Sequence, residues 1–244
     1  MDTTTQTPPS RVSETATQEG EILLRWSWVE WAVWTPRMLT ALEQGVKGDV
    51  WFSLIDKVFS ERNLRAAFCK VAANDGAPGV DHVTVSMFER DLEANLRKLS
   101  EQLRAGEYRP QAVRRVHIPK PGSKETRPLG IPTVRDRVVQ AAVRHVLEPI
   151  FEKEFAPHSY GFRPRRGCKD ALRRVDQLLK EGYVFVVDAD LKSYFDTIPH
   201  EPLMARVRDR IADGRVLTLI ESFLKAGILD SLTEWTPEAG APQG

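Results

Sequence analysis

The stretch VFVVDADLKSYFDTIPH, residues 184–200, joins an apolar run directly to a cluster of acids. Its first four residues are apolar without a break, which predicts a strand over residues 183–189 that is covered on both faces. Asp188 and Asp190 lie two residues apart and would share one face of that strand. A carboxylate at a buried edge is costly unless something compensates its charge. The candidates are a basic partner such as Lys192, a helix N-terminus, and a divalent metal ion, which prefers oxygen ligands.

Composition gives a second indication of function. The chain has 244 residues, of which 41% are hydrophobic and 28% charged, as in ordinary globular proteins. The formal net charge is only +1, yet residues 109–174 hold 16 Lys and Arg against 6 Asp and Glu, a local net charge of +10. A region this basic predicts a polyanionic partner, most simply nucleic acid. The alternative is a solvated surface whose charges are balanced in space.

The N-terminal region and the cysteines bear on location and on domain organisation. The first 20 or so residues are polar and are expected to be disordered, and no run of about 18 apolar residues predicts a membrane span. Cys69 and Cys168 lack metal-ligand spacing, which indicates reduced thiols in the cytoplasm.

Four tryptophans between residues 26 and 34 predict a packing surface, with RNA or a missing part of the protein as alternative contacts. We expect residues 1–45 to form this tail and Trp-rich extension.

Hydrophobic periodicity places helices and one hairpin along the rest of the chain. The pattern predicts two short helices broken near Ser60, then one helix from Ser86 that uses Ser86 and Glu89 as a capping box and ends at Gly106. A hairpin is expected over residues 113–118 and 127–131. Further helices are expected over residues 134–155, bent or ended by Pro149, and over residues 169–180, 201–211 and 214–226.

The segment that begins at Asp190, DLKSYFDTI, resembles the first catalytic motif of reverse transcriptases, in the form used by bacterial group II intron proteins. Four more segments match that family in the same order: GAPGVD (76–81), RPLGIPTVRDRVVQAAV (127–143), SYGFRPRRGC (159–168) and GAPQG (240–244). The resemblance covers about residues 45–244. It implies an α+β right-hand polymerase, helix-rich with a small antiparallel sheet, with fingers over residues 46–181 and a partial palm over residues 182–244.

The resemblance also assigns roles at the acidic segment. Asp190 would be the first metal-binding aspartate, and the backbone carbonyl of Leu191 would help to hold a second Mg²⁺ ion. Asp188 would at most tune this site. Phe195 matches the aromatic that packs against C2′ of an incoming nucleotide and so excludes a ribose hydroxyl. Taken alone, Phe195 would be interpreted as a core aromatic.

Basic residues receive the remaining roles. Lys120 and Arg127 on the hairpin resemble the residues that close on the triphosphate, and spacing alone leaves Arg114 and Arg115 open as alternatives. Gln243 matches the glutamine that touches the incoming nucleotide and the template. Another set of arginines, in the 159–168 motif, would bind template RNA: Arg163, Arg165 and Arg166. The alternative is a structured loop in which Arg163 and Arg166 pair with acids.

The family pattern carries a second motif, Tyr-x-Asp-Asp, downstream of GAPQG, and the sequence ends before it. By family, the expected activity is RNA-directed DNA synthesis from dNTPs on an RNA template with a DNA primer, together with a role in the splicing and mobility of intron RNA. We expect this chain to be truncated and inactive alone, with the C-terminal half supplied by a separate chain. The alternatives are a non-catalytic module that binds intron RNA and a degenerate remnant.

Overall fold

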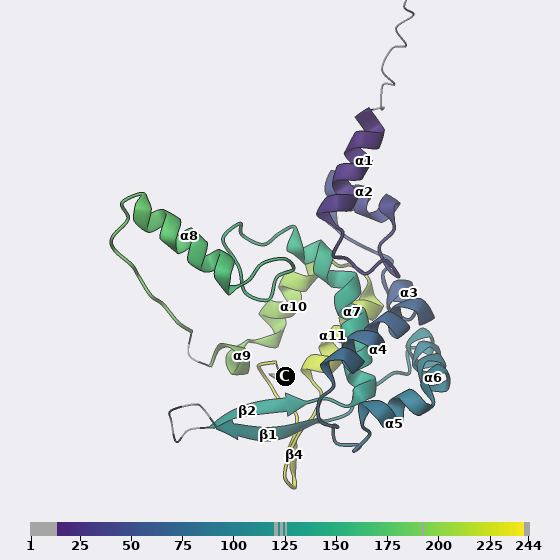
Figure 1. Cartoon of the computed structure of the whole chain (residues 1–244). Coiled ribbons are helices and arrows are strands. Elements are labelled where there is room, and N and C mark those ends of the chain that lie inside the picture. The colour runs from purple at the N-terminus through teal and green to yellow at the C-terminus, as the bar shows by residue number, and fades with distance from the viewer. Residues whose placement is uncertain (1–13, 120–121, 123, 125, 192, 242–244) are drawn as a thin grey trace, which may run out of the picture.

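The computed structural model describes residues 14–119, 122, 124, 126–191 and 193–241. Helices dominate, and a small sheet lies at one end of the molecule (Figure 1). The central helix is α7 (Val134–Glu152), and three helices from the first half of the chain pack against it: α3 (Ile55–Val58), α4 (Glu61–Asn74) and α5 (Val85–Arg90). Helix α6 (Leu92–Ala105) packs on α4 and α5, and the short 3₁₀ helix η1 (Lys47–Asp49) precedes α3.

Helix α7 forms because its sequence combines a good cap with an apolar stripe. The hydroxyl of Thr133 accepts the backbone N–H of Asp136 and so caps the helix. Apolar residues at helical spacing form the buried face that meets α4: Val138, Val139, Ala142, Val143 and Val146. The breaks around α4 were predicted correctly, because Ser60 caps it by accepting the backbone N–H of Asn63.

Pro149 lies inside α7, which continues to Glu152, so of the two predicted alternatives, a bend or an end at this residue, the end is wrong. A proline has no N–H to offer the carbonyl oxygen four residues earlier, which here belongs to His145. That oxygen instead accepts the indole N–H of Trp34, at 2.9 Å. A side chain more than a hundred residues away therefore satisfies the carbonyl that Pro149 leaves free.

The Trp-rich segment packs against the rest of the protein. It lies between α1 (Glu14–Arg25) and α2 (Pro36–Gln44). The expected disorder of the first 20 or so residues is therefore wrong from Glu14 onward, where α1 begins. Trp26 and Trp34 are buried in the same hydrophobic core as α4 and α7. Trp26 also donates its indole N–H to Glu43 at 2.7 Å. The prediction of a packing surface is confirmed for these two residues, whereas Trp31 is exposed.

The helix predicted from Ser86 is divided into α5 and α6. Asp91, with φ −115° and ψ 36°, interrupts the helical backbone between them. The cap of the first helix is Thr84, which accepts the backbone N–H of Met87, so the predicted capping box at Ser86 is wrong. Gly106 ends α6 in the left-handed conformation, with φ 74°, as expected.

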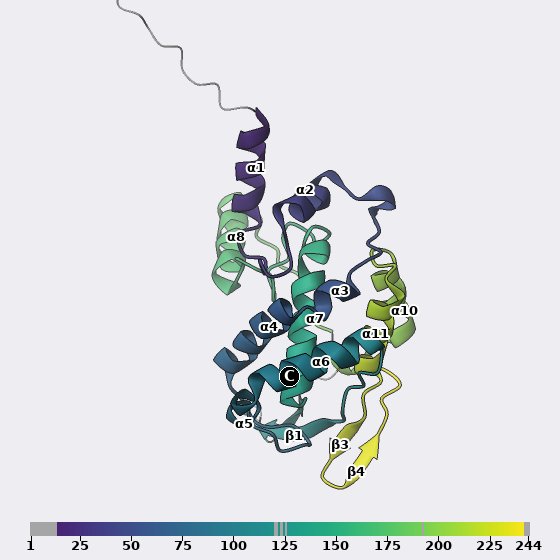
Figure 2. The same cartoon turned by 90° about the vertical axis from the view of Figure 1, so that its right-hand side faces the viewer.

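The sheet has the strand order β2-β1-β3-β4. The predicted hairpin is confirmed as β1 (Val113–Pro119) and β2 (Thr126–Ile131). Two short strands that periodicity did not predict, β3 (Ile228–Asp230) and β4 (Thr233–Trp235), extend the sheet beyond β1 (Figure 2). Because β1 and β3 are parallel, the sheet is mixed rather than antiparallel.

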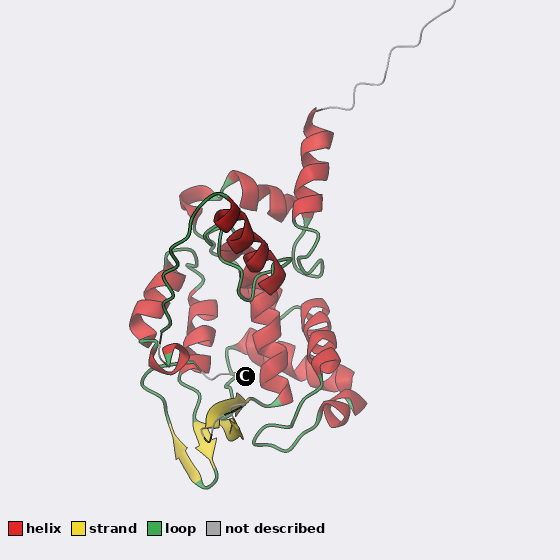
Figure 3. Cartoon of the chain, turned by 60° about the vertical axis from the view of Figure 1, so that its left-hand side comes forward, coloured by secondary structure: helices red, strands yellow, loops and turns green. Residues whose placement is uncertain are grey.

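The second half of the chain adds four helices: α8 (Cys168–Lys180), α9 (Tyr194–Thr197), α10 (His200–Arg208) and α11 (Gly214–Leu224). The strand predicted over residues 183–189 is absent. These residues run as an extended loop from α8 to α9 (Figure 3), and Phe185 is 95% exposed. A strand needs a partner for its backbone groups, and no described segment pairs with this one. The apolar run therefore lacks the cover that the sequence predicted.

One carboxylate joins the beginnings of two helices. Asp213 is buried and caps α11 by accepting the backbone N–H groups of Arg215 and Val216. Its other oxygen accepts the N–H groups of Leu54 and Ile55, at 2.8 and 2.9 Å, at the start of α3. Burial alone would raise the pKa of Asp213, but the four N–H donors outweigh it and lower that pKa below its usual value.

A pH dependence follows from Asp213. Because its folded pKa is lowered, its contribution to stability is present above the unfolded pKa of about 3.9 and is lost as pH falls through the folded value. We expect Asp213→Asn to lower the free energy of unfolding by about 1–2 kcal/mol at pH 7. Urea titrations between pH 7 and pH 3 should show this difference shrinking at the acid end. A difference that is constant with pH would contradict the assignment.

Candidate nucleotide and RNA site

A cavity of about 460 Å³ lies between the hairpin and the C-terminal segment. Strands β1 and β2 line one side, and Asp196 with residues 235–241 lines the other. The volume is within the range of small-molecule sites in proteins. The cavity therefore places the hairpin, the start of α9 and the GAPQG motif around one space.

The first two residues of the GAPQG motif, Gly240 and Ala241, are held against the backbone of the predicted sugar gate. Ala241 donates its backbone N–H to the carbonyl of Phe195 at 2.7 Å, and Gly240 donates to Ile198 at 2.8 Å. Gly240 has φ 87°, and a Cβ there would lie 2.8 Å from the backbone oxygens of Phe195 and Asp196. The backbone at position 240 can therefore come this close to the backbone of Phe195 and Asp196 only because the residue is glycine. Gln243, the nucleotide-binding residue predicted from this motif, lies outside the described residues.

Phe195 is half-exposed at the surface of α9. Its ring meets the edge of Tyr194, with ring centroids 5.5 Å apart. The interpretation of Phe195 as a core aromatic is therefore wrong in this structure. An exposed ring beside the GAPQG segment is in a position to contact a ligand.

The hairpin arginines have different surroundings. Arg127 is exposed on β2, opposite Ile118. Arg114 donates to the carbonyl of Pro78 at 2.7 and 3.1 Å, and Arg115 stacks over the ring of Trp235 at 4.8 Å. Lys120 lies outside the described residues. Arg114 is thus held by the GAPGVD loop, whereas Arg115 lines the cavity and Arg127 is exposed on the neighbouring strand, so both of these remain candidates for a triphosphate.

The acidic segment does not form a complete metal site. Asp188 and Asp190 are both exposed, and Leu191 is exposed beside them. Within the described part of the chain, no three His, Cys, Asp or Glu residues come together in a way that could hold a metal ion. Divalent-metal sites in phosphoryl transfer need several oxygen ligands. The described residues alone therefore do not fit a two-ion centre.

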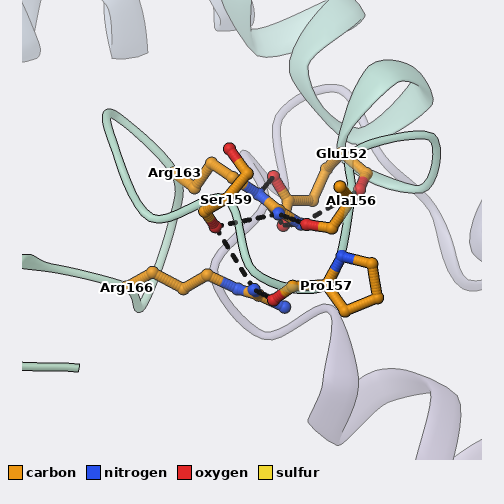
Figure 4. A network of polar contacts seen from close by, with 6 residues as sticks. All are labelled: Glu152, Ala156, Pro157, Ser159, Arg163 and Arg166. Atoms are coloured by element: carbon orange, nitrogen blue, oxygen red, sulfur yellow. Dashed lines mark hydrogen bonds and ion pairs between the residues drawn. The ribbon is translucent and has the colours of Figure 1, made fainter. Parts of the chain in front are cut away.

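Arg163 is buried and holds the 159–168 loop together (Figure 4). Its guanidinium donates to both carboxylate oxygens of Glu152, the closest at 2.7 Å, and to the carbonyls of Ala156 and Ser159, at 2.7 and 3.1 Å. These contacts use all three nitrogens of the side chain. Direct contact with RNA, the predicted role of Arg163, disagrees with this geometry, and the alternative of a loop stabilised by an acid is confirmed for this residue.

Arg165 and Arg166 are more exposed than Arg163. Arg166 donates to the backbone carbonyls of Pro157 and Ser159 (Figure 4), and its guanidinium lies over the ring of Tyr160. Arg165 is exposed and donates to Ser27 and to the carbonyl of Leu24. Directly before the buried Arg163, the ring of Phe162 is 97% exposed, on a backbone with φ 55°. The loop thus presents an aromatic ring next to basic side chains.

Sequence reasoning missed how the GAPGVD loop is fixed. Arg137 of α7 donates to the carbonyls of Asp75 and Ala77, at 3.0 and 3.1 Å, as Arg114 does to Pro78. A Cβ on Gly79 would come within 2.6 Å of the backbone nitrogen of Thr133. Gly79 of the GAPGVD motif could have indicated this contact from sequence, because close approach of two backbones is a common reason for glycine in a loop.

Comparison with known proteins defines the class. Residues 118–244, just over half of the chain, match the family model for "Reverse transcriptase (RNA-dependent DNA polymerase)". A solved structure of a "Partial Cas6-RT-Cas1--Cas2 complex" has a TM-score of 0.52 at 22% identity and covers 79% of this chain and 32% of that one, which supports the fold alone. The chain belongs to the reverse transcriptase family.

The curated relatives narrow the class further. Protein YkfC of Escherichia coli (strain K12) is 45% identical over 171 residues, which are 68% of this chain and 45% of that protein. The group II intron-encoded protein LtrA of Lactococcus lactis subsp. cremoris is 41% identical over 152 residues, 62% of this chain and 25% of that protein. The chain is a group II intron reverse transcriptase/maturase relative that spans less than half the length of these two proteins.

None of the described helices has the length and apolar character needed to cross a membrane.

Proposed function

We propose that the chain provides the fingers and part of the palm of an RNA-directed DNA polymerase of the group II intron type. The observation that carries the proposal is the attachment of the GAPQG segment to the backbone of Phe195, at the edge of the 460 Å³ cavity. An incoming dNTP would bind there. Intron RNA, as template and as splicing substrate, and a DNA primer are the proposed polymeric partners.

Each residue of the site has a proposed task. The ring of Phe195 would pack against the sugar and exclude a 2′-hydroxyl. Arg127 would grip the triphosphate, since a guanidinium can donate two parallel hydrogen bonds to phosphate oxygens. Lys120 and Gln243 keep the roles that the resemblance implies, as a point charge on the triphosphate and as a contact to nucleotide and template.

The family generally uses a divalent metal, and Mg²⁺ is our proposal for the ion. Asp190 and the carbonyl of Leu191 would provide part of its ligands. Because the described residues do not complete such a site, we propose that a further polypeptide segment, encoded separately or attached, supplies the remaining carboxylates. The chain as described would then be inactive in the absence of that segment.

We propose the cytoplasm as its compartment, since Cys69 and Cys168 are free thiols.

RNA-templated primer extension tests the proposal. The chain would be mixed with an annealed RNA template and DNA primer, dNTPs and Mg²⁺, with and without the part of YkfC that lies outside its matched region. We expect incorporation of dNTPs over NTPs in the presence of that fragment, and none with the chain alone. Template-independent incorporation, or equal use of NTPs, would contradict the proposal.

The second candidate function is a non-catalytic module that binds intron RNA. Two observations favour it. The described residues include no cluster that could hold a metal ion, and residues 109–174 carry an excess of Lys and Arg over Asp and Glu. Both functions predict RNA binding that weakens steeply between about 50 and 200 mM salt, because neutralised phosphates release counterions. Only the polymerase predicts incorporation once the fragment is added. RNA binding that is insensitive to salt would contradict both.

Phe162 provides a sharper test of RNA binding. Stacking of a base on an aromatic ring contributes roughly 1–3 kcal/mol. We therefore expect Phe162→Ala to weaken binding of single-stranded RNA by about 10-fold. Because the ring is 97% exposed, the thermal midpoint should stay unchanged. Leu232→Ala, which removes an equally exposed side chain at the β3–β4 turn, is the matched control. Equal RNA affinity of Phe162→Ala and the wild type, measured by fluorescence anisotropy, would exclude Phe162 from the interface.

A further inference from the structure

The carboxylate of Asp136 joins three segments that meet at the base of the β1–β2 hairpin. Asp136 lies in the first turn of α7 and is 1% exposed. Its Oδ1 accepts the hydroxyl of Tyr108 at 2.6 Å, and its Oδ2 accepts the backbone N–H of Gln111 at 3.0 Å and the hydroxyl of Thr133 at 2.7 Å. Two of these donors precede β1 along the chain, and the third follows β2. We call these four residues the hairpin clamp.

Capping of α7 does not explain all of these contacts. Thr133 caps the helix by accepting the backbone N–H of Asp136, and its hydroxyl donates to the carboxylate in return. Tyr108 and Gln111, however, belong to the segment between α6 and β1 and contact the carboxylate rather than the helix backbone. A buried carboxylate is costly without donors, and the donors found here fix both ends of the hairpin to α7.

The donor farthest along the chain from Asp136 is itself held in place. Tyr108 is 4% exposed, and the guanidinium of Arg135 lies over its ring at 5.0 Å while donating to Gln102 at 3.2 Å. Burial, together with the neighbouring carboxylate, raises the pKa of Tyr108. The phenol therefore keeps its proton at neutral pH and stays a donor to Asp136.

The far part of the hairpin depends on this base for its direction. Among the described strands, β3 pairs with β1 at Val113 and Arg114, and β2 is an edge strand (Figure 1). Arg127 lies opposite Ile118, five residues beyond Val113, which is roughly 17 Å at about 3.4 Å per residue. A tilt of about 10° at the base would therefore move Arg127 by about 3 Å.

A displacement of this size decides whether an arginine reaches a phosphate, because N–H···O hydrogen bonds form only at about 2.7–3.2 Å between the heavy atoms. Both described candidates for the triphosphate stand on the hairpin: Arg115 near its base, where it lines the cavity, and Arg127 farther out. The geometry at the base of the hairpin therefore sets the position of both guanidinium groups.

We propose that Asp136 is a positioning residue for nucleotide binding, whose carboxylate fixes the direction of the β1–β2 hairpin and thereby places Arg115 and Arg127 at the cavity. Asp136 touches no substrate in this role and acts only through the hairpin. The identity of the ligand rests on the proposed function, whereas the hydrogen bonds that fix the hairpin do not.

The direction of the hairpin is measured first, on the full chain alone. Residual dipolar couplings of backbone amides report the orientation of β1 and β2 relative to α7, and in the wild type we expect all three to fit one rigid body. Asp136→Asn leaves one acceptor oxygen in place of two. In this variant the cross-strand hydrogen bonds should remain, but the hairpin should no longer fit the orientation of α7. Tyr108→Phe, which removes one donor and keeps the ring, should cause a smaller change of the same kind and decides the question if Asp136→Asn does not fold.

Titration of the same samples with inorganic triphosphate measures the effect on binding without any reaction. In the wild type, the amide signals of Arg115 and Arg127 should shift and saturate. In Asp136→Asn, half-saturation should require on the order of 10-fold more triphosphate, because misplacement of a binding group by an ångström or more is costly. Signals of Arg115 and Arg127 that do not respond in the wild type would overturn the proposal.

Steady-state incorporation is measured in the complex with the part of YkfC outside its matched region. We expect Asp136→Asn to raise the KM for dNTPs on the order of 10-fold and to keep kcat within a factor of about three, because the lost contacts bind the substrate and the transition state alike.

Asp213→Asn is the matched control for both measurements. It alters another buried carboxylate, whose N–H donors lie at the starts of α3 and α11 rather than at the hairpin. This variant should lose stability but keep the orientation of the hairpin, the affinity for triphosphate and the KM. An equal change in both variants would show a general loss of stability and would overturn the proposal.

Two further results would also overturn it: hairpin couplings that stay unchanged in Asp136→Asn, and a fall in kcat at unchanged KM. Failure of the proposed function looks different. If the hairpin turns and triphosphate binding weakens in Asp136→Asn, but no complex incorporates dNTPs, the polymerase assignment fails and the positioning role stands. If the wild-type complex incorporates dNTPs and Asp136→Asn does so with the same KM, the positioning role fails and the polymerase stands.

Discussion

Replacing Arg163 by methionine is expected to lower the free energy of unfolding by about 3–5 kcal/mol, because it leaves a carboxylate buried without its partner. Arg163 and Glu152 are both largely buried, and the guanidinium also donates to the carbonyls of Ala156 and Ser159. The change removes these hydrogen bonds together and keeps most of the apolar stem. Urea unfolding at neutral pH, followed by circular dichroism, would measure the loss.

Arg165→Met is the matched control, since the same residue type two positions later is exposed. It should cost less than about 1 kcal/mol in stability, as exposed polar contacts usually do, and it should weaken RNA binding. The opposite pattern, with full stability after Arg163→Met but weaker RNA binding, would show that Arg163 contacts RNA directly. In that case the role implied by the family resemblance would be correct and the structural role wrong.

Asp190→Ala is expected to reduce RNA-templated incorporation by about 1,000-fold or more in the complex with the complementing fragment. Removing one carboxylate from a divalent-metal centre forfeits several kcal/mol of transition-state stabilisation, and each 1.36 kcal/mol is tenfold in rate. Because Asp190 is exposed and carries no structural contact among the described residues, stability and RNA affinity should not fall.

Asp56→Ala, an exposed acid on α3 far from the cavity, is the control for the loss of a negative charge. It should leave incorporation within a factor of about two, since exposed charges change local interactions by fractions of a kcal/mol. Incorporation that survives Asp190→Ala would remove Asp190 from the catalytic centre. Incorporation that falls equally in both variants would indicate an effect of net charge.

Local signals predicted most of the helical framework. The apolar stripes of α4 and α7 and the turn chemistry between β1 and β2 lie within short windows, so periodicity identifies them. Gly106 was likewise recognisable as a helix end. The predictions that failed depend on contacts between distant segments. Strand β3 pairs with β1 across more than a hundred residues of chain. Strands β3 and β4 are also too short, at three residues each, to show a hydrophobic pattern.

The errors at single residues have the same origin. Nothing near Pro149 in sequence reveals that Trp34 satisfies the carbonyl of His145, so the local sequence left a bend and an end of the helix equally open. Arg163 and Arg165 are indistinguishable in sequence, yet one is buried on Glu152 and the other is exposed. The strand expected at residues 183–189 has the correct composition but no described partner, and propensity alone cannot form a sheet.

Of the site, the sequence predicted the proximity of Phe195 to the GAPQG motif only through the family resemblance. Only the contact of Arg114 with the carbonyl of Pro78 shows that Arg114 is held away from a role as triphosphate ligand. The incompleteness of the metal site is a matter of spatial grouping, which spacing along the chain does not reveal.

Localised cleavage by Fe²⁺, substituted for Mg²⁺ in the complemented complex with RNA template and DNA primer, tests the central claim most directly. Radicals formed at the bound ion cut the nearest backbone, so the cut sites report where the ion lies. We predict cleavage within residues 188–191 that requires the complementing fragment and disappears in Asp190→Ala. Cleavage elsewhere in the chain with residues 188–191 intact, or cleavage there that persists in Asp190→Ala, would contradict the account.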